Sequence, residues 1–442
     1  MIKRLALAAT VAFVVAASAA TAVATALPSA AHPRRASAQQ TRHRRVSTQP
    51  DPVVAFNQLL AQVLTAPGAQ PPTIHPTRTM AITQIAVYDA VNGILGQGSP
   101  MRSRDRGPRH ASADAAAAAA ARTALDALLP TQQMVVDAFY AHALTQIGSG
   151  VAVRAGVRFG ERMAHAVLAG RAHDGASATP PAFMPQPGPG EYQLTPPAFA
   201  PAGFTQTAHV TPFVLRSARQ FRPAPPPALS SPRYAADFAE VRSLGELDSA
   251  TRTVDETAIG RFWGAAPIWI VWNQVADQAA IGMHNGLEQN ARLFALLNTT
   301  LADGAIALYD AKYADHRWRP ITAITAADQG NPNTTADPNW VPLANTANDP
   351  SYPGAHAEFS QAAAEVLEDS FGTDVFRFTL SNATVGITRS FESFSQAADE
   401  ASASRIFAGQ HFRYDEDAGQ TLGGQVASFV LDHAFMPARR GR

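Results

Sequence analysis

The chain has 442 residues, 35 basic against 35 acidic side chains, and no cysteine. The balanced charge argues against a general nucleic-acid binder, which carries a basic excess, and the missing cysteines exclude disulfides and thiolate metal sites. The length allows about two or three domain units. Charged residues make up only 16% and alanine is abundant, a composition typical of a largely helical globular protein.

The N-terminus has the layout of a secretory signal. Lys3 and Arg4 precede an almost wholly apolar run at 5–15, and small residues follow; this order is that of a cleaved signal. The run is shorter than the about 20 residues that a membrane span needs, so an uncleaved anchor is the second interpretation. We expect a signal peptide at 1–27, a disordered leader at 28–50, and a secreted protein without another membrane span.

Helical periodicity dominates the next region, which we place at 51–178. Apolar residues recur there at spacings of three and four, and the nearly all-Ala stretch in its middle is a strong helix former. The expected helices cover 51–65, 79–95, 111–129, 132–147 and 151–171.

Residues 179–232 differ from their surroundings. They hold many of the 33 prolines and show little periodicity. Long irregular segments in compact domains usually cover a site or link units. We interpret this segment as a Pro-rich wrap over a helical body, with a flexible linker as the alternative.

The C-terminal region, 233–436, returns to helical patterns. It contains no convincing strand ladder and no repeat of fixed period, so we predict an all-α fold, a helical bundle. The polar loop at 331–349 is long enough to suggest a function. The expected helices cover 231–244, 254–263, 267–286, 291–313, 357–371, most of 387–405, and 415–435.

Three short segments of this region carry cations and histidines. Such side chains, together with backbone donors, suit a tetrahedral oxyanion such as phosphate or vanadate. Read singly, each residue is better explained as a surface cation, a helix cap or a solvated pair; their combination favours one site. The segments are Lys312 to Pro320, Tyr352 to Ala357, and Ser404 to Asp415.

The cations come from the first and third segments. Lys312 and Arg319 are seven residues apart, so they share one helix face if the helix continues to Pro320. Arg405 adds a forked donor suited to oxyanion oxygens.

The histidines and their neighbours complete the pattern. His356 opens a helix near 357, where the backbone N–H groups of Gly354 and Ala355 can point at an anion and the imidazole can serve as acid or base. His411 and Asp415 are four apart, which on a helix allows a hydrogen bond that fixes the tautomer and raises the basicity of the other ring nitrogen.

These segments resemble the three signatures of the superfamily that joins vanadium-dependent haloperoxidases to type 2 phosphatidic acid phosphatases. The second signature, Pro-Ser-Gly-His in the family, is only partly kept. The sequence around Trp318 and the run Ser404-Arg-Ile-Phe are closer to the chloroperoxidase branch. The first and third signatures are matched at Lys312, Arg319, Pro320, Ser404, Arg405, His411 and Asp415.

The resemblance implies an all-helical bundle and a role for each matched residue. His411 would be the vanadium ligand of bound vanadate or the nucleophile towards phosphate, and His356 the acid–base group. The implied oxyanion contacts are Lys312, Arg319, Gly354, Ala355 and Arg405, with Asp415 behind His411.

Two departures affect the expected chemistry. Gly354 and Ala355 stand where the family has Ser and Gly, so one hydroxyl donor is lost, worth ~1.5–3 kcal/mol. Asp349 lies where chloroperoxidase-like members tend to carry an aromatic residue near the halide, and its charge would repel a halide.

Three functions follow as hypotheses. The first is a secreted vanadium-dependent haloperoxidase that uses vanadate, peroxide and halide. The second is a phosphomonoesterase acting through His411 on the same cradle, and the third is a helical binding protein with a decayed site. We expect small-molecule partners and no nucleic acid; the oligomeric state stays open. His75, His284 and His316 lack metal-ligand spacing.

Overall fold

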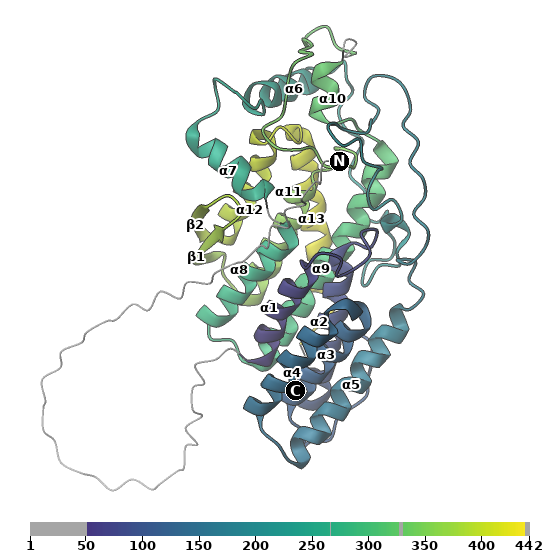
Figure 1. Ribbon diagram of the computed structural model, residues 1–442, viewed down its shortest axis with the longest axis vertical. Coiled ribbons are helices and arrows are strands. Elements are labelled where there is room, and N and C mark those ends of the chain that lie inside the picture. Colours follow the sequence, from purple (N-terminus) through teal and green to yellow (C-terminus); the bar gives the residue numbers. More distant parts are fainter. Residues whose placement is uncertain (1–50, 266, 327–329, 438–442) are drawn as a thin grey trace, which may run out of the picture.

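The computed structural model describes residues 51–265, 267–326 and 330–437. The predicted signal peptide and leader, residues 1–50, lie outside this part. The described residues form two packed groups of helices, one N-terminal and one C-terminal (Figure 1). The predicted all-α bundle is therefore confirmed, with one hairpin as an exception.

The N-terminal group packs closely because small residues line its contacts. Gly156 and Gly160 of the fifth helix lie so near the Ala-rich third helix that an added Cβ would come within 2.2 Å of a backbone oxygen of Ser112 or Ala116. The group comprises α1 (Pro52–Leu64), α2 (Pro76–Leu95), α3 (Ala113–Leu128), the short η1 (Pro130–Gln132), α4 (Gln133–Ile147) and α5 (Val151–Arg171).

One long helix, α9 (Leu287–Asp315), forms the centre of the molecule. It contacts α2 on the N-terminal side and α11 and α13 on the C-terminal side. Among the described helices it alone is long and apolar enough to cross a membrane, but 94% of its most apolar window is buried inside the protein. The C-terminal group also contains α6 (Pro232–Leu244), α7 (Val254–Gly264), α8 (Ile268–Gly282), α10 (Pro320–Thr325), α11 (Ala355–Phe371), α12 (Phe394–Phe407) and α13 (Arg413–His433).

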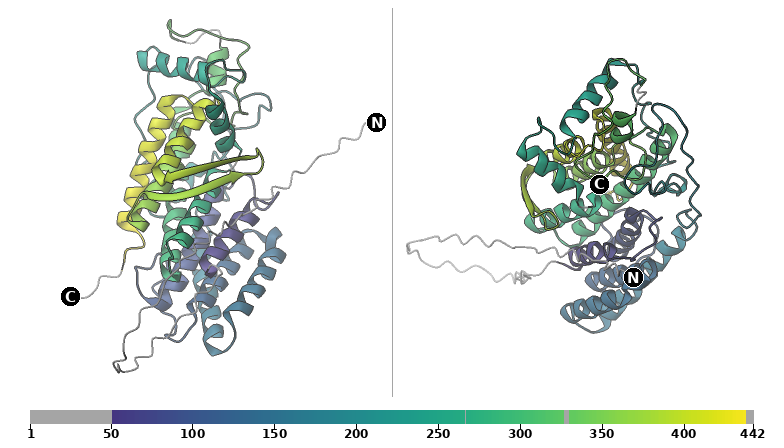
Figure 2. Two further views of the ribbon diagram at one scale, coloured as in Figure 1. Left: turned by 90° about the vertical axis from the view of Figure 1, so that its left-hand side faces the viewer. Right: turned by 45° about the horizontal axis from the view of Figure 1, so that its top comes forward.

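A β-hairpin replaces part of a predicted helix. Strands β1 (Val375–Asn382) and β2 (Ile387–Ser393) pair antiparallel, with Phe378 opposite Phe391. The predicted helix at 387–405 is wrong over its first seven residues, because α12 begins only at Phe394, where the Ser393 hydroxyl caps it. The hairpin extends from the side of the C-terminal group (Figure 2) and contacts α8 and α12.

The Pro-rich segment lies against the C-terminal group as a wrap. Within 179–231 the structure is irregular except for η2 (Thr207–His209). The carboxylate of Asp303 in α9 accepts three consecutive backbone N–H groups, of residues 213–215, at 2.6–2.8 Å. The Tyr192 N–H donates to the His316 carbonyl at 2.6 Å. These contacts hold the segment against α9, the helix that precedes the predicted site. A flexible linker would not make such contacts.

Candidate anion site

The first signature spans a helix end, not one continuous helix. Helix α9 stops at Asp315, His316 takes a left-handed conformation (φ 49°), and Arg319 precedes α10. The helix does not continue to Pro320, so the shared helix face that depended on this does not form. The turn still brings Lys312 and Arg319 together, because both contact the same carboxylate. Both side chains are almost fully buried.

That carboxylate belongs to Asp349. Its Oδ1 accepts a hydrogen bond from Arg319 Nη2 and lies 3.4 Å from Lys312 Nζ. Burial alone would raise the pKa of Asp349, but the charges of Lys312 and Arg319 hold it below its usual value. Burial also lowers the pKa of Lys312 to about 8, against the opposing effect of Asp349. Asp349 is thus an ionised internal partner of two predicted anion-binding cations.

His411 lies just before α13, so His411 and Asp415 do not share one helix. Its contact with Asp415 nevertheless forms, with Nδ1 3.3 Å from Oδ2, while Nε2 lies 2.9 Å from Arg319 Nη1. Burial lowers the pKa of His411 well below its usual value, and the charges of Arg319 and Lys312 add to this effect. A neutral imidazole donates from Nδ1 to Asp415 and keeps its Nε2 lone pair toward the cations.

Arg405 is the cation with unused donors. It is buried, and its Nε and Nη1 atoms have no hydrogen-bond partner within the described part of the chain. Burial lowers its pKa to about 10, with Glu416 opposing the shift. A buried guanidinium in this state is costly unless a guest supplies acceptors.

His356 occupies the second position of α11. Its Nε2 lies 3.1 Å from the Trp263 carbonyl, to which the ring N–H donates. Burial lowers the pKa of His356 well below its usual value, and Arg405 and Arg319 contribute. The same two arginines act on His411, so the predicted cations and both histidines lie in one site, in which His356 is half-buried.

The second signature differs from the expected cradle in one donor. The Gly354 N–H donates to the Asp415 carbonyl at 2.8 Å and is therefore not free for an anion. Helix α11 begins at Ala355 without a side-chain cap, so its first N–H groups remain without intrahelical partners. A Cβ on Gly354 would lie 2.2 Å from Glu416 Oε1, which means that Glu416 fills the space a serine would need.

Two site residues were missed from the sequence. Ser351 donates from its hydroxyl to Asp415 at 2.6 Å, and Glu416 is buried with Oε1 3.7 Å from His411 Nδ1. Burial raises the pKa of Glu416 to about 8 and that of Asp415 to about 6. Their only sequence signal was position: Ser351 directly precedes the second signature, and Glu416 follows Asp415.

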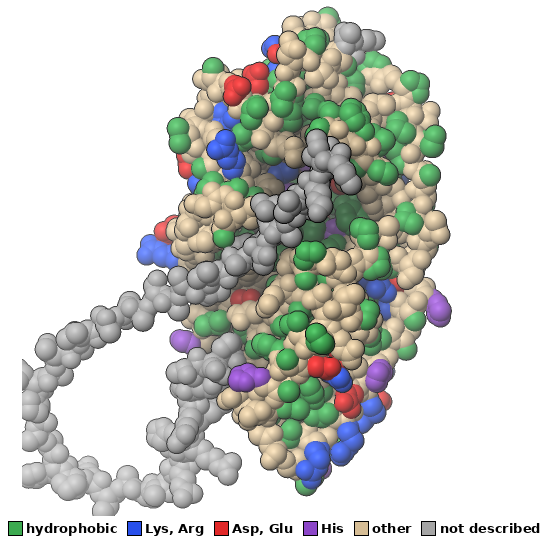
Figure 3. Space-filling view, in the orientation of Figure 1, with side chains coloured by type: hydrophobic (Ala, Val, Ile, Leu, Met, Phe, Trp, Pro, Cys, Tyr) green, Lys and Arg blue, Asp and Glu red, His purple; other side chains and the backbone are tan. Residues whose placement is uncertain are grey.

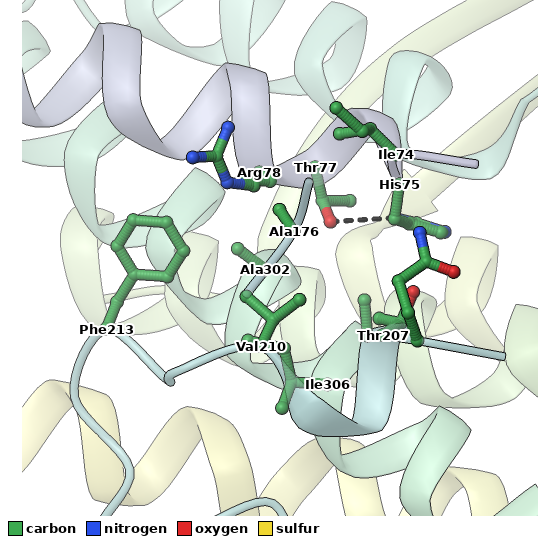
Figure 4. Close-up of a pocket in the computed structure, with 12 residues that line it drawn as sticks. Ile74, His75, Thr77, Arg78, Ala176, Thr207, Val210, Phe213, Ala302 and Ile306 are labelled. Carbon is green, nitrogen blue, oxygen red and sulfur yellow. Dashed lines mark hydrogen bonds between the residues drawn. The ribbon is translucent and has the colours of Figure 1, made fainter. Parts of the chain in front are cut away.

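The three further histidines considered in the sequence, His75, His284 and His316, are not gathered in a metal-binding group. No group of three or more His, Asp or Glu side chains suited to a metal ion occurs among the residues that the structure describes. His284 is exposed and His316 half-buried. His75 lines a small hollow with residues of η2 and α9, where its Nδ1 lies 2.8 Å from the Thr77 hydroxyl (Figure 4).

None of the predicted site residues lines this hollow. Contacts of His75 and Tyr309 connect it to Asp349, the partner of Lys312 and Arg319. The His75 ring packs 5.6 Å from the Tyr309 ring, and the Tyr309 hydroxyl lies 3.3 Å from Asp349 Oδ2.

A separate view of the surface shows one face hollowed in its upper half, with Lys or Arg and His atoms visible inside (Figure 3).

Comparisons with known proteins agree with this arrangement. Residues 292–439 match the family model of the VCPO second helical-bundle domain. The chain is 25% identical to vanadium chloroperoxidase of Curvularia inaequalis over 240 residues, 40% of this chain and 39% of that protein. It therefore spans well under half of the curated relative it matches.

Solved structures show the same fold over almost the whole chain. The first bacterial vanadium-dependent iodoperoxidase superposes with a TM-score of 0.77 at 23% identity, covering 89% of this chain and 99% of that one. The holo form of a bacterial vanadium-dependent chloroperoxidase gives 0.67 at 16% identity, covering 87% and 98%.

The chain therefore has the fold of the solved bacterial vanadium-dependent haloperoxidases, and its C-terminal region matches a vanadium chloroperoxidase domain model. The family match is confined to the C-terminal bundle, residues 292–439. The resemblance seen in the sequence is confirmed at this level.

Proposed function

We propose that the protein is a secreted vanadium-dependent haloperoxidase-like enzyme that holds vanadate at the candidate anion site. The Nε and Nη1 donors of Arg405, which have no partner among the described residues, carry this proposal, since an oxyanion that accepts from them would stabilise the buried cation. His411 Nε2 would be the vanadium ligand. Lys312 and Arg319 would share the remaining charge, and the first N–H groups of α11 would add neutral donors.

The protein's own residues prepare this site for proton transfer. Asp415 accepts from His411 Nδ1 and leaves Nε2 as the ring's lone-pair atom. His356 commits its Nε2–H to Trp263, so its Nδ1 is free to take a proton from a reacting group. Bound vanadate would supply a Lewis-acidic centre that activates hydrogen peroxide for oxygen transfer to a halide. The names of the relatives, chloroperoxidase and iodoperoxidase, support this chemistry.

Phosphate-ester hydrolysis is the second candidate, and Asp349 favours it. A carboxylate in the site disfavours a halide by charge repulsion, whereas the same cations suit a phosphate. His411 Nε2 would attack phosphorus as the ester P–O bond breaks. The leaving oxygen would take a proton from His356, which would first take one up at Nδ1 beside the bound anion, and water would then cleave the phosphorus–nitrogen bond and release phosphate.

The deciding experiment uses the purified protein with vanadate. We expect saturable vanadate binding in equilibrium dialysis and vanadate-dependent bromide oxidation with peroxide. His411→Ala should lose both, and exposed His284→Ala should lose neither. Turnover of p-nitrophenyl phosphate without any halide oxidation would support the second candidate, and no binding of vanadate or phosphate would reject both.

A further inference from the structure

Asp349 occupies donors that a bound oxyanion would use. Lys312 Nζ donates to the Pro350 and Ser351 carbonyls and faces the Asp349 carboxylate, so its three N–H groups are all engaged. Arg319 donates to the Asp349 backbone and side chain, to Gln410 and to His411. An oxyanion therefore meets these two cations in the presence of a competing carboxylate.

The competing carboxylate is held firmly in place. Its Oδ1 is bound by Lys312 and Arg319, and its Oδ2 lies 3.3 Å from the Tyr309 hydroxyl. Tyr309 is itself buried and packs against the rings of His75 and Phe204 at 5.6 and 5.3 Å. These contacts leave Asp349 beside the cations, so it becomes a neighbour of any guest that binds them.

A carboxylate neighbour distinguishes between oxyanions by their protons. An ionised carboxylate only accepts hydrogen bonds. Phosphate and vanadate keep at least one O–H near neutral pH and can donate to it, whereas sulfate carries no proton and offers only repulsion. A site with a committed acceptor rejects a guest that lacks the matching donor, because the buried group is left unpaired.

We propose that Asp349 is a specificity-determining residue that makes the site select tetrahedral oxyanions bearing a proton and reject those without one. The inference rests on the proposed function only in taking the site to bind an oxyanion. It applies directly to vanadate and inorganic phosphate, which carry the required O–H; a phosphate monoester carries one only as its monoanion, below about pH 6.

The test compares phosphate with sulfate in the full-length protein. Their affinities are measured by isothermal calorimetry at pH 7 and constant ionic strength, for the wild type and Asp349→Asn. The wild type should prefer phosphate. In the variant, sulfate affinity should rise by about 10- to 100-fold, the scale of one hydrogen bond to a charged group, while phosphate affinity rises less. Asp349→Ser repeats the test if the asparagine variant does not fold.

Asp310→Asn is the matched control. Asp310 and Asp349 are equally exposed, at 9% each, and Asp310 also pairs with an arginine, Arg222 at 2.6 Å, outside the site. This variant should keep the wild-type phosphate-to-sulfate ratio. An unchanged ratio in folded Asp349→Asn that still binds phosphate would overturn the inference alone. Failure of the wild type to bind phosphate or vanadate would overturn the proposed function as well.

Discussion

The two halves of the anion site treat their buried charges in opposite ways. In one half, Lys312 and Arg319 share the carboxylate of Asp349. In the other, two donor atoms of Arg405 have no hydrogen-bond partner among the described residues, and the pKa of its acidic neighbour Glu416 is raised. We therefore expect the first half to contribute to the stability of the protein without a bound anion, and the second half to lower that stability. The proposed function assigns the second half to anion binding.

Exchanging the two arginines for methionine should separate these roles most clearly. Arg319→Met removes one partner of a buried pair and should lower the free energy of unfolding by about 3–5 kcal/mol. Arg405→Met replaces a buried, unpaired cation by an apolar side chain and should raise it, by at most about 1–4 kcal/mol. Urea denaturation without added anion measures both changes.

Both arginine variants should bind phosphate more weakly than the wild type, because each removes a cation from the site. Equal destabilisation by Arg319→Met and Arg405→Met would show that the two halves do not differ as described.

The pH dependence of stability should also differ between the halves. The pKa of Glu416 rises from 4.5 to about 8 on folding, so between these values the folded state holds a proton that the unfolded state has released. Glu416 therefore lowers stability as pH rises through this interval, by at most about 1.4 kcal/mol per pH unit. Asp349, with a lowered pKa, contributes stability that is lost only as pH falls below its usual value of 3.8.

Denaturation of the wild type and Glu416→Gln from pH 4 to 9 checks this. The difference in unfolding free energy should change across pH 4.5–8 and stay level above it. A constant difference would mean that Glu416 is ionised in the folded protein.

The smallest effect is expected at the edge of the paired half. Tyr309→Phe removes the hydroxyl that lies 3.3 Å from Asp349 Oδ2. A single hydrogen bond of this kind contributes about 0.5–1.5 kcal/mol, so thermal unfolding should shift by a few degrees at most. Sulfate binding should improve slightly, because Asp349 is less firmly held. A shift as large as that of Arg319→Met would place the hydroxyl among the main supports of the site.

The sequence predicted the helices better than the chain reversals. Sustained three-and-four spacing located the helices around α1 to α5, but the hairpin was missed because Ile387, Phe391 and Phe394 satisfy a helical spacing as well as a strand. The alternation of Phe376, Phe378 and Leu380 with polar residues in β1 was a period-two signal, but it was too short to outweigh the helical spacing. The end of α9 was predicted to within two residues, but the left-handed turn at His316 that follows it was not.

The residues of the site could be predicted from the sequence, but the contacts among them could not. The signatures named Lys312, Arg319, Arg405, His356 and His411, which the structure brings together. That Asp349 would neutralise two of them depends on a long-range contact that no local pattern encodes. The catalytic and binding roles of these residues remain predictions for the experiments above.

The contact between Asp303 of α9 and the Pro-rich wrap shows that the segment matched by the family model does not fold with all its contacts inside itself. The family match begins at residue 292, yet Asp303 inside it receives three N–H groups from residues 213–215, and its burial raises its pKa to about 6. A fragment that begins at residue 292 would bury the Asp303 carboxyl without the three N–H groups that bind it. Gene fusions and shortened expression fragments of this protein therefore need the wrap as well as the bundle.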